Sequence, residues 1–293
     1  MPTVIDISSL GSAGFIIRGG QTYGHVGSSV SDAGDINGDG FDDFIVGAPW
    51  AGPYSRGAAY VIFGEAGGFA TVDLDSLEPD EGFRLEGIDG YDRAGQSVSS
   101  AGDVNGDGFD DIVVGAPFAD GESDNKSGKA YVIFGKAGGF ADIDLAGLEL
   151  APEDGFVIRG HQPGDLAGYS VSSAGDINGD GFDDLIVGAP QAGEDESVGG
   201  GDHGEAYVIF GKAAGFSTID LGVLHLAEDA YDPTVGFMIS APESSQGAFD
   251  SDYDQLGFSV AGAGDVNDDG YDDLIVGARY FGGYFAPGAA ERM

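Results

Sequence analysis

Short apolar segments of about five or six residues recur along the whole chain, and each is bounded by glycine, aspartate or proline. The segments are rich in valine, isoleucine, phenylalanine and tyrosine, which are the residue types that favour β-strands. No long amphipathic stretch with helical periodicity lies between them. This pattern predicts an all-β protein made of short strands joined by turns.

The segments recur in a fixed order, which makes the chain a repeat array. One unit contains an apolar opening stretch, a strand that starts with Gly-Phe, a Gly-x-Ser-Val strand, an acidic nonapeptide, a strand that ends in Gly-Ala-Pro, and a strand that ends in Phe-Gly. Length differences fall before Gly-x-Ser-Val and after Gly-Ala-Pro, so both places are predicted loops. The approximate repeat boundaries are 1–69, 70–140, 141–216 and 217–293, and the last repeat is incomplete.

Four-stranded units repeated in a fixed order are typical of the blades of a β-propeller. A β-solenoid is the alternative, but its coils are usually much shorter than these repeats. We therefore predict that residues 1–293 form a single propeller array. Two arrangements stay open: the N-terminal Gly-Phe strand completes the last blade and closes a ring of four, or the four blades are part of a larger propeller.

The acidic nonapeptide, first seen as "DINGDGFDD" at 35–43, places side-chain oxygens at its positions 1, 3, 5 and 9 and glycine at position 6. Ca²⁺ binds six to eight oxygens, and a tight loop with alternate residues facing inward supplies them, here with the backbone carbonyl of position 7. A plain hairpin turn is the simpler alternative, but a turn needs neither the aspartates at positions 1 and 9 nor a fourfold repetition. The segment is no EF-hand, because its twelfth position is a valine within an apolar strand.

We therefore predict about four Ca²⁺ ions, one for each nonapeptide. The predicted ligands of the first two copies are Asp35, Asn37, Asp39, Phe41 and Asp43, then Asp103, Asn105, Asp107, Phe109 and Asp111. Those of the last two copies are Asp176, Asn178, Asp180, Phe182 and Asp184, then Asp265, Asn267, Asp269, Tyr271 and Asp273. The aspartates at position 8 are expected to face solvent rather than the ion, namely Asp42, Asp110, Asp183 and Asp272.

Composition narrows the possible partners. The 51 acidic and 11 basic residues give a formal net charge of −40, which argues against binding to nucleic acid or to anionic lipid. The absence of cysteine excludes disulfides, thiolate metal sites and cysteine nucleophiles. No apolar run approaches the length of a membrane helix, so we expect no membrane insertion, and the N-terminus lacks the pattern of a signal peptide.

The Phe-Gly and Gly-Ala-Pro strands with an intervening Asp-x-Asn-x-Asp-Gly-x-x-Asp loop resemble FG-GAP repeats, as found in the propeller of integrin α subunits and in secreted bacterial proteins. The resemblance implies a propeller with Ca²⁺ in the loop between the first and second strands of each blade. It departs from the family pattern in three ways: four blades instead of the usual seven, "GAR" in place of the last "GAP", and no final Phe-Gly strand.

The resemblance also implies a function, namely an extracellular or cell-surface module for adhesion or recognition of a protein or glycan ligand. In such modules the ligand face is opposite the calcium loops, and Trp50, Tyr54 and Arg56 are candidates for it because these residue types dominate binding hot spots. Two alternatives are a propeller segment of a secreted hydrolase and a structural spacer of a surface protein. No enzyme is expected, because the four histidines fall at different places in the repeat and no Gly-x-Ser-x-Gly motif occurs.

Overall fold

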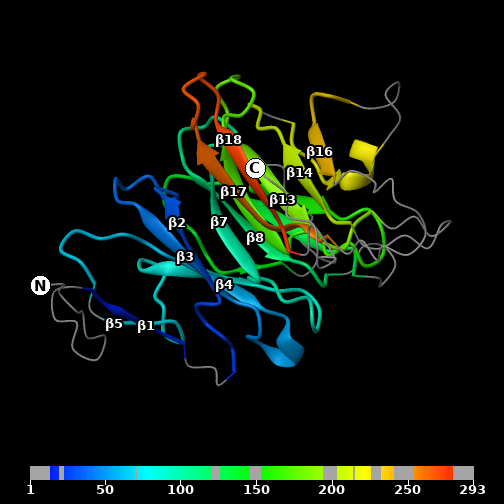
Figure 1. The fold of residues 1–293 in the computed structure, drawn as a ribbon. Coiled ribbons are helices and arrows are strands. Elements are labelled where there is room, and N and C mark those ends of the chain that lie inside the picture. Colours follow the sequence, from blue (N-terminus) through cyan, green and yellow to red (C-terminus); the bar gives the residue numbers. More distant parts are fainter. Residues whose placement is uncertain are drawn as a thin grey trace, which may run out of the picture.

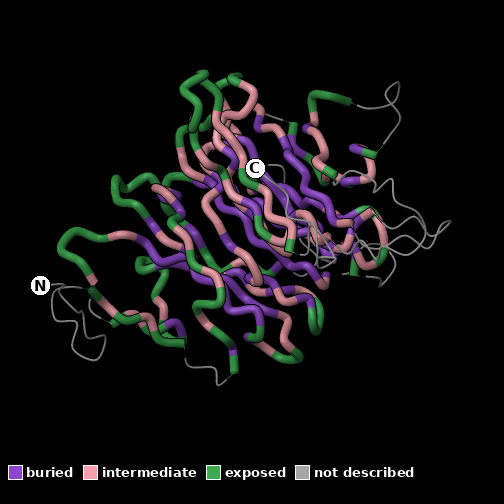
Figure 2. Tube along the Cα trace, viewed as in Figure 1, coloured by how far each residue is buried: buried purple, intermediate pink, exposed green. Residues whose placement is uncertain are grey.

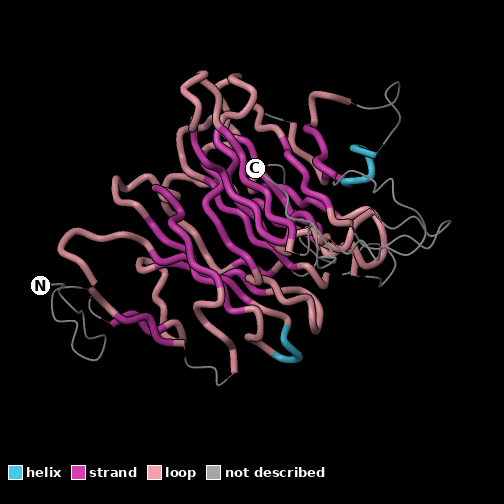
Figure 3. The backbone as a smooth tube through the Cα atoms, in the orientation of Figure 1, coloured by secondary structure: helices cyan, strands magenta, loops and turns pink. Residues whose placement is uncertain are grey.

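The computed structural model describes residues 14–19, 23–69, 71–119, 126–145, 153–193, 203–213, 215–225, 232–240 and 254–279. Short strands dominate this part of the chain, and the described helical segments are two 3₁₀ turns at its rim, η2 (Pro53–Ser55) and η3 (Leu221–His225) (Figure 3). The prediction of an all-β fold is confirmed. Neither turn has the length or apolar character needed to span a membrane.

Three sheets follow the same plan, in which four antiparallel strands run from an innermost to an outermost position. The first sheet contains β2 (Ser29–Gly34), β3 (Asp43–Ala48), β4 (Ala58–Ile62) and β6 (Gly82–Glu86). The second contains β7 (Ser97–Gly102), β8 (Asp111–Ala116), β9 (Lys129–Ile133) and β11 (Gly155–Arg159). The third contains β12 (Ser170–Gly175), β13 (Asp184–Ala189), β14 (Glu205–Ile209) and β16 (Gly236–Ser240). We call these sheets blades one to three.

The fourth repeat contributes a two-stranded sheet of β17 (Leu256–Gly264) and β18 (Asp273–Ala278), which we call blade four. Residues 280–293, which include the place where the fourth repeat lacks its Phe-Gly strand, lie outside the described residues.

The sheets do not follow the repeat boundaries of the sequence. The Gly-Phe strands of the second, third and fourth repeats, β6, β11 and β16, pair with the Phe-Gly strand of the repeat before, as Gly82 of β6 does with Ile62 of β4. Each of the three so becomes the outermost long strand of that earlier blade. The apolar opening stretches add short parallel edge strands: β5 (Thr71–Asp73) pairs with β1 (Ile16–Arg18), β10 (Ile143–Asp144) with β6, and β15 (Ile219–Asp220) with β11. The pairing of strands, rather than the boundaries of the sequence repeats, therefore defines a blade.

The hydrophobic core is divided into layers between successive blades. The layer between blades one and two joins residues such as Ile45 and Phe83 to Val98 and Tyr131, and equivalent positions form the layer between blades two and three. Figure 2 shows the buried residues along the strands and the exposed ones at the loops and edges. Because valine and isoleucine in β3, β8 and β13 are covered on both faces, these strands carry nearly continuous apolar runs instead of alternation.

The innermost strands β2, β7, β12 and β17 lie side by side in that order, and the blades fan out from them as an open arc (Figure 1). Among the described strands, β1 pairs with β5 and no pairing joins β1 or β2 to blade four. The arrangement is propeller-like, and the described residues do not close a ring.

Candidate functional site

The four acidic nonapeptides occupy equivalent turns of the fold. Each connects the innermost strand of a blade to the second strand, between β2 and β3, β7 and β8, β12 and β13, and β17 and β18. This is the location that the family resemblance implies for calcium. All four turns therefore lie at the same end of the blades.

The first loop is held by its own side chains. The carboxylate of Asp35 accepts hydrogen bonds from the backbone N–H of Asp39 at 3.0 Å and of Gly40 at 2.9 Å. The side-chain oxygen of Asn37 also accepts from Asp39 N–H, and Asp39 Oδ1 accepts from the N–H of Phe41 at 2.9 Å. The second and third loops repeat these bonds. Positions 1, 3 and 5 are thereby wrapped into one tight turn, as the alternate spacing predicts.

The ninth-position aspartates point into the blade. Asp43 accepts a hydrogen bond from Ile36 N–H at 3.2 Å and from Gly64 N–H at 2.7 Å, and Asp111 and Asp184 have equivalent partners. Asp43 is 2% exposed, and Asp111 and Asp184 are 0% exposed. Because burial disfavours the charged carboxylate, the pKa of Asp43 is raised to about 6, that of Asp111 to about 8 and that of Asp184 to about 7.

The donor set of each loop fits a hard cation in its chemistry, because it offers only carboxylate, amide and carbonyl oxygens and no histidine. Each carboxylate oxygen that accepts one N–H also keeps a second lone pair. Within the described residues, however, no three Asp, Glu or His side chains are gathered as a preformed metal cage.

The fourth loop keeps the bonds of position 1, with Asp265 accepting from Asp269 N–H at 3.1 Å and from Gly270 N–H at 2.9 Å, whereas Asn267 donates from its side-chain amide to Asp273 at 3.4 Å. These backbone bonds lower the pKa of the Asp265 carboxyl, the bond from Gly270 being the largest cause. Asp268, which replaces the glycine found at position 4 in the other copies, adopts φ 62°. Aspartate tolerates this left-handed conformation better than most residues, so the substitution leaves the loop intact.

The expectation that the eighth-position aspartates face solvent is wrong in three of the four copies. Asp110, Asp183 and Asp272 do not simply face solvent, because each carboxylate accepts a hydrogen bond from the loop of the preceding blade. Asp42, in blade one, is exposed. The difference arises from the arc, since blade one has no described acidic loop in front of it.

The residues predicted for the ligand face lie at the end of the blades opposite the acidic loops, in the β3–β4 connection. Trp50 is 40% exposed and its ring carries the guanidinium of Arg93, 4.2 Å from the ring centroid, with His25 on the same ring at 5.5 Å. Tyr54 is 74% exposed and lies near Tyr91 of the next interblade loop. Arg56 forms a 3.9 Å ion pair with Glu86. Trp50 thus packs against Arg93 and His25 and is also partly accessible to solvent.

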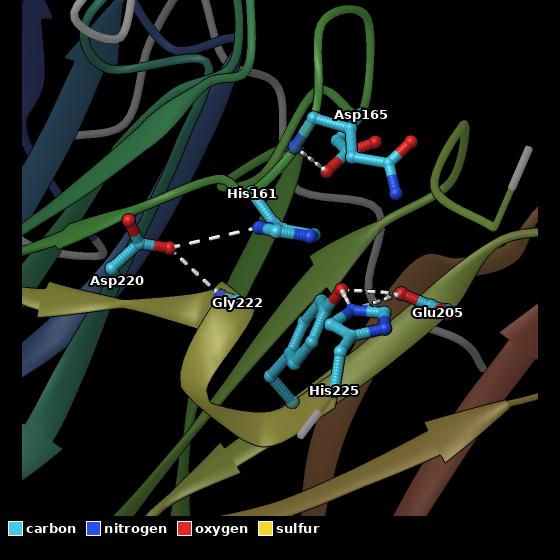
Figure 4. Close-up of polar contacts among 8 residues, drawn as sticks. His161, Asp165, Glu205, Asp220, Gly222 and His225 are labelled. Atoms are coloured by element: carbon cyan, nitrogen blue, oxygen red, sulfur yellow. Dashed lines mark hydrogen bonds and ion pairs between the residues drawn. The ribbon is translucent and has the colours of Figure 1, made fainter. Parts of the chain in front are cut away.

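A cluster that the sequence analysis missed lies at the same end, between blades two and three (Figure 4). The hydroxyl of Tyr207 donates to Glu205 and lies 2.8 Å from Nε2 of His225, while that nitrogen is 3.2 Å from the Glu205 carboxylate. His161 stacks on His225 with 5.1 Å between ring centroids. Glu205 is 5% exposed, so a buried carboxylate is held by a tyrosine and a histidine.

The electrostatics of this cluster favour proton binding. The hydrogen bond that His225 donates to the Glu205 carboxylate raises the pKa of His225 above its ordinary value, against a smaller opposing effect of burial. Burial raises the pKa of Asp165 to about 6, and the Glu205 carboxylate adds to that rise. Histidines at unrelated repeat positions meet here because β15, which leads directly into η3, pairs in parallel with β11. No spacing rule within one repeat reveals this contact.

Comparison with known proteins agrees with the resemblance to FG-GAP repeats. FG-GAP repeats match residues 27–62, 94–133, 167–209 and 256–290. The chain is 30% identical to integrin alpha-V of Gallus gallus over 258 residues, which is 87% of this chain and 20% of that protein. It is 33% identical to integrin alpha-5 of Xenopus laevis over 175 residues, 58% of this chain and 15% of that protein.

Integrin alpha-8 of Gallus gallus is 30% identical over 255 residues, again 87% of this chain and 20% of that protein. The chain therefore spans about a fifth or less of the length of the relatives that it matches. The matched repeats cover the acidic loops and the strands on both sides of them. The chain belongs to the FG-GAP repeat family.

Proposed function

We propose that this chain is a calcium-binding module of an extracellular or cell-surface protein, and that it serves adhesion or recognition of a protein or glycan ligand. The observation that carries the proposal is the fourfold recurrence of one all-oxygen loop at one end of the blades. The family membership and the similarity to integrin alpha subunits support it.

In this proposal the ion is held by positions 1, 3, 5 and 9 of each loop and by the carbonyl of position 7. Bound Ca²⁺ supplies positive charge that offsets the repulsion among the loop carboxylates. The residues themselves position the ligands: the backbone N–H groups orient the aspartates at positions 1 and 9, and glycine at position 6 permits the sharp turn.

Calcium titration with thermal unfolding tests the metal part. A ligand that binds only the folded protein raises its stability by about 2.7 kcal/mol for one site at a hundredfold excess over Kd. We expect saturating Ca²⁺ to raise the Tm above that in chelator, and Asp39→Ala to reduce the rise by about one site's share. Equal Tm values with Ca²⁺ and with chelator would contradict the proposal.

The proposal that the chain binds a ligand rests on the end of the blades opposite the acidic loops, which we call the Trp50 end. Exposed aromatic rings beside arginine are the residue types that dominate binding hot spots, and Trp50, Tyr54 and Arg56 all lie on that end. Binding of the calcium-loaded chain to an array of matrix proteins and glycans tests it. We expect Trp50→Ala or Tyr54→Ala to weaken the binding of this chain to a partner that is found on the array. Binding that survives both substitutions would place the ligand elsewhere.

A further inference from the structure

We propose that each acidic loop is completed by the blade that follows it, with the eighth-position aspartate of the next loop acting as a positioning residue for the calcium ligands. This inference rests on the proposed function, because it concerns the ion that those loops are proposed to hold. It assigns a role to Asp110, Asp183 and Asp272, three aspartates whose own loops do not use them as ligands.

The central contact recurs at all three described junctions. The N–H of Asp35 donates to Asp110 Oδ2 at 2.8 Å, that of Asp103 to Asp183 Oδ2 at 2.8 Å, and that of Asp176 to Asp272 Oδ2 at 2.9 Å. In every case the donor belongs to position 1, whose side chain is the first predicted ligand. The residues of the first pair are 75 positions apart in the chain, so the contact exists only when two blades are docked.

At each of the three described junctions, two glycines are required by this docking. A Cβ on Gly34 would collide with the Asp110 carboxylate, and a Cβ on Gly38 would collide with the ring of Phe109. Gly102 and Gly106 face Asp183 and Phe182 in the same way. The glycine before position 1 and the one at position 4 therefore leave room for the carboxylate and the aromatic ring of the next blade.

The backbone of the next blade adds further hydrogen bonds. Lys136 N–H donates to the carbonyl of Ile36 at 2.9 Å, and Gly138 N–H donates to that of Asn37 at 3.0 Å. Lys212 N–H makes the equivalent bond to Val104, also at 2.9 Å. Positions 2 and 3 of a loop are thus held from the next blade as well as position 1.

These contacts are the outer sphere of the proposed metal site. Groups that orient a ligand without touching the metal commonly change metal affinity by about tenfold or more. Asp110 fixes the backbone of Asp35, and the Asp35 carboxylate is in turn aligned by Asp39 and Gly40. Calcium affinity at the first loop therefore depends on the docking of blade two. Among the described residues no blade follows blade four, and no contact of this kind reaches its loop.

Hydrogen exchange of the whole chain, measured across a calcium titration, tests the inference loop by loop. We expect Asp110→Ala to raise the calcium concentration that half-protects residues 35–43 by about tenfold, while residues 103–111 keep their midpoint. The change in calcium midpoint is thus expected in blade one, although the substitution lies in blade two. A merely local role of Asp110 would instead shift 103–111.

The chain offers a matched control, because Asp42 occupies the same loop position without a described preceding loop. Asp42→Ala is expected to leave both midpoints unchanged. Asp110→Asn is expected to restore the midpoint of 35–43, since the amide oxygen still accepts the N–H of Asp35. If Asp110→Ala fails to fold, Asp183→Ala provides the same measurement at residues 103–111.

The outcomes separate this inference from the proposed function. Absence of calcium-dependent protection in all loops of the unmodified chain would refute calcium binding itself. Protection in the unmodified chain, with no shift at 35–43 in Asp110→Ala or an equal shift in Asp42→Ala, would overturn only the positioning role.

Discussion

The junctions between blades one and two and between blades two and three are built from equivalent strands but carry different chemistry at the Trp50 end. Tyr131 in β9 and Tyr207 in β14 occupy the same place, paired with Val114 and Val187, and both are almost fully buried. Tyr207 bonds to Glu205 and His225, whereas the Tyr131 hydroxyl has no hydrogen-bond partner among the described residues. One backbone position thus supports either a satisfied polar network or an unpaired hydroxyl.

Both junctions contain a buried aspartate, Asp92 or Asp165, but the first adds Arg93 at the loop position that Leu166 occupies in the second. Its guanidinium lies between two rings, 4.2 Å from the centroid of Trp50 and 4.4 Å from that of Phe118. What distinguishes the first junction is therefore a cation between aromatic rings, and what distinguishes the second is the hydrogen-bonded network of Tyr207, Glu205 and His225. Repeated strands determine where side chains meet, and individual substitutions determine how they interact.

The largest expected effect is at Tyr207. Tyr207→Phe removes a hydroxyl that serves a buried carboxylate, and hydrogen bonds to charged groups contribute about 1.5–3 kcal/mol. We expect a loss of unfolding free energy in that range, measured by urea denaturation of the calcium-loaded chain. An unchanged midpoint and slope would show that the Glu205 network adds no stability to the second junction.

Arg93→Ala is expected to have the next largest effect. A cation over an aromatic face contributes about 0.5–2 kcal/mol, so the loss should be of the order of 1 kcal/mol by the same denaturation experiment. Arg93→Lys keeps the charge but not the flat stacking surface, and should recover only part of it. Full recovery with lysine would mean that charge alone, and not stacking between Trp50 and Phe118, holds the first junction.

The second junction should also respond to pH. The raised pKa of His225 means that the folded state binds the proton more tightly than the unfolded state, so the stabilisation is complete below the unfolded pKa of about 6.5. It is lost as the pH rises through the higher folded pKa. The groups facing His225 are Glu205, Asp165, Tyr207 and His161.

We therefore expect the contribution of His225 to the Tm of the calcium-loaded chain to fall between pH 6 and pH 8, measured as the difference between the unmodified chain and His225→Gln at each pH. The raised pKa of Asp165, about 6, acts in the same direction, but its contribution is lost mainly below pH 6 and should remain in the variant. An identical pH profile with and without His225 would contradict the assignment.

The smallest effect is expected at Tyr131. Removal of a buried hydroxyl without a partner leaves the apolar packing in place and relieves a desolvation cost. Tyr131→Phe should therefore be neutral or slightly stabilising, and it is the matched control for Tyr207→Phe at the neighbouring junction. A loss as large as that of Tyr207→Phe would reveal a partner for the Tyr131 hydroxyl.

The sequence by itself determined the features that repeat within about seventy residues. Strand-forming segments, glycine-rich turns and the acidic nonapeptide between two strands all depend on local spacing, and the structure confirms the all-β fold and the place of the loops. The oxygen spacing within each loop is likewise local, which is why the bonds of Asp35 and Asn37 follow the predicted pattern.

Only the tertiary structure decided what meets across blades. The bond between Asp35 and Asp110 joins residues 75 positions apart, and the stacking of His161 on His225 joins two different repeats. The assignment of each Gly-Phe strand to the preceding blade depends on strand register. A repeat pattern specifies the position of each residue within its own unit. Which unit lies against it, and through which side chains, is set by the packing of neighbouring blades.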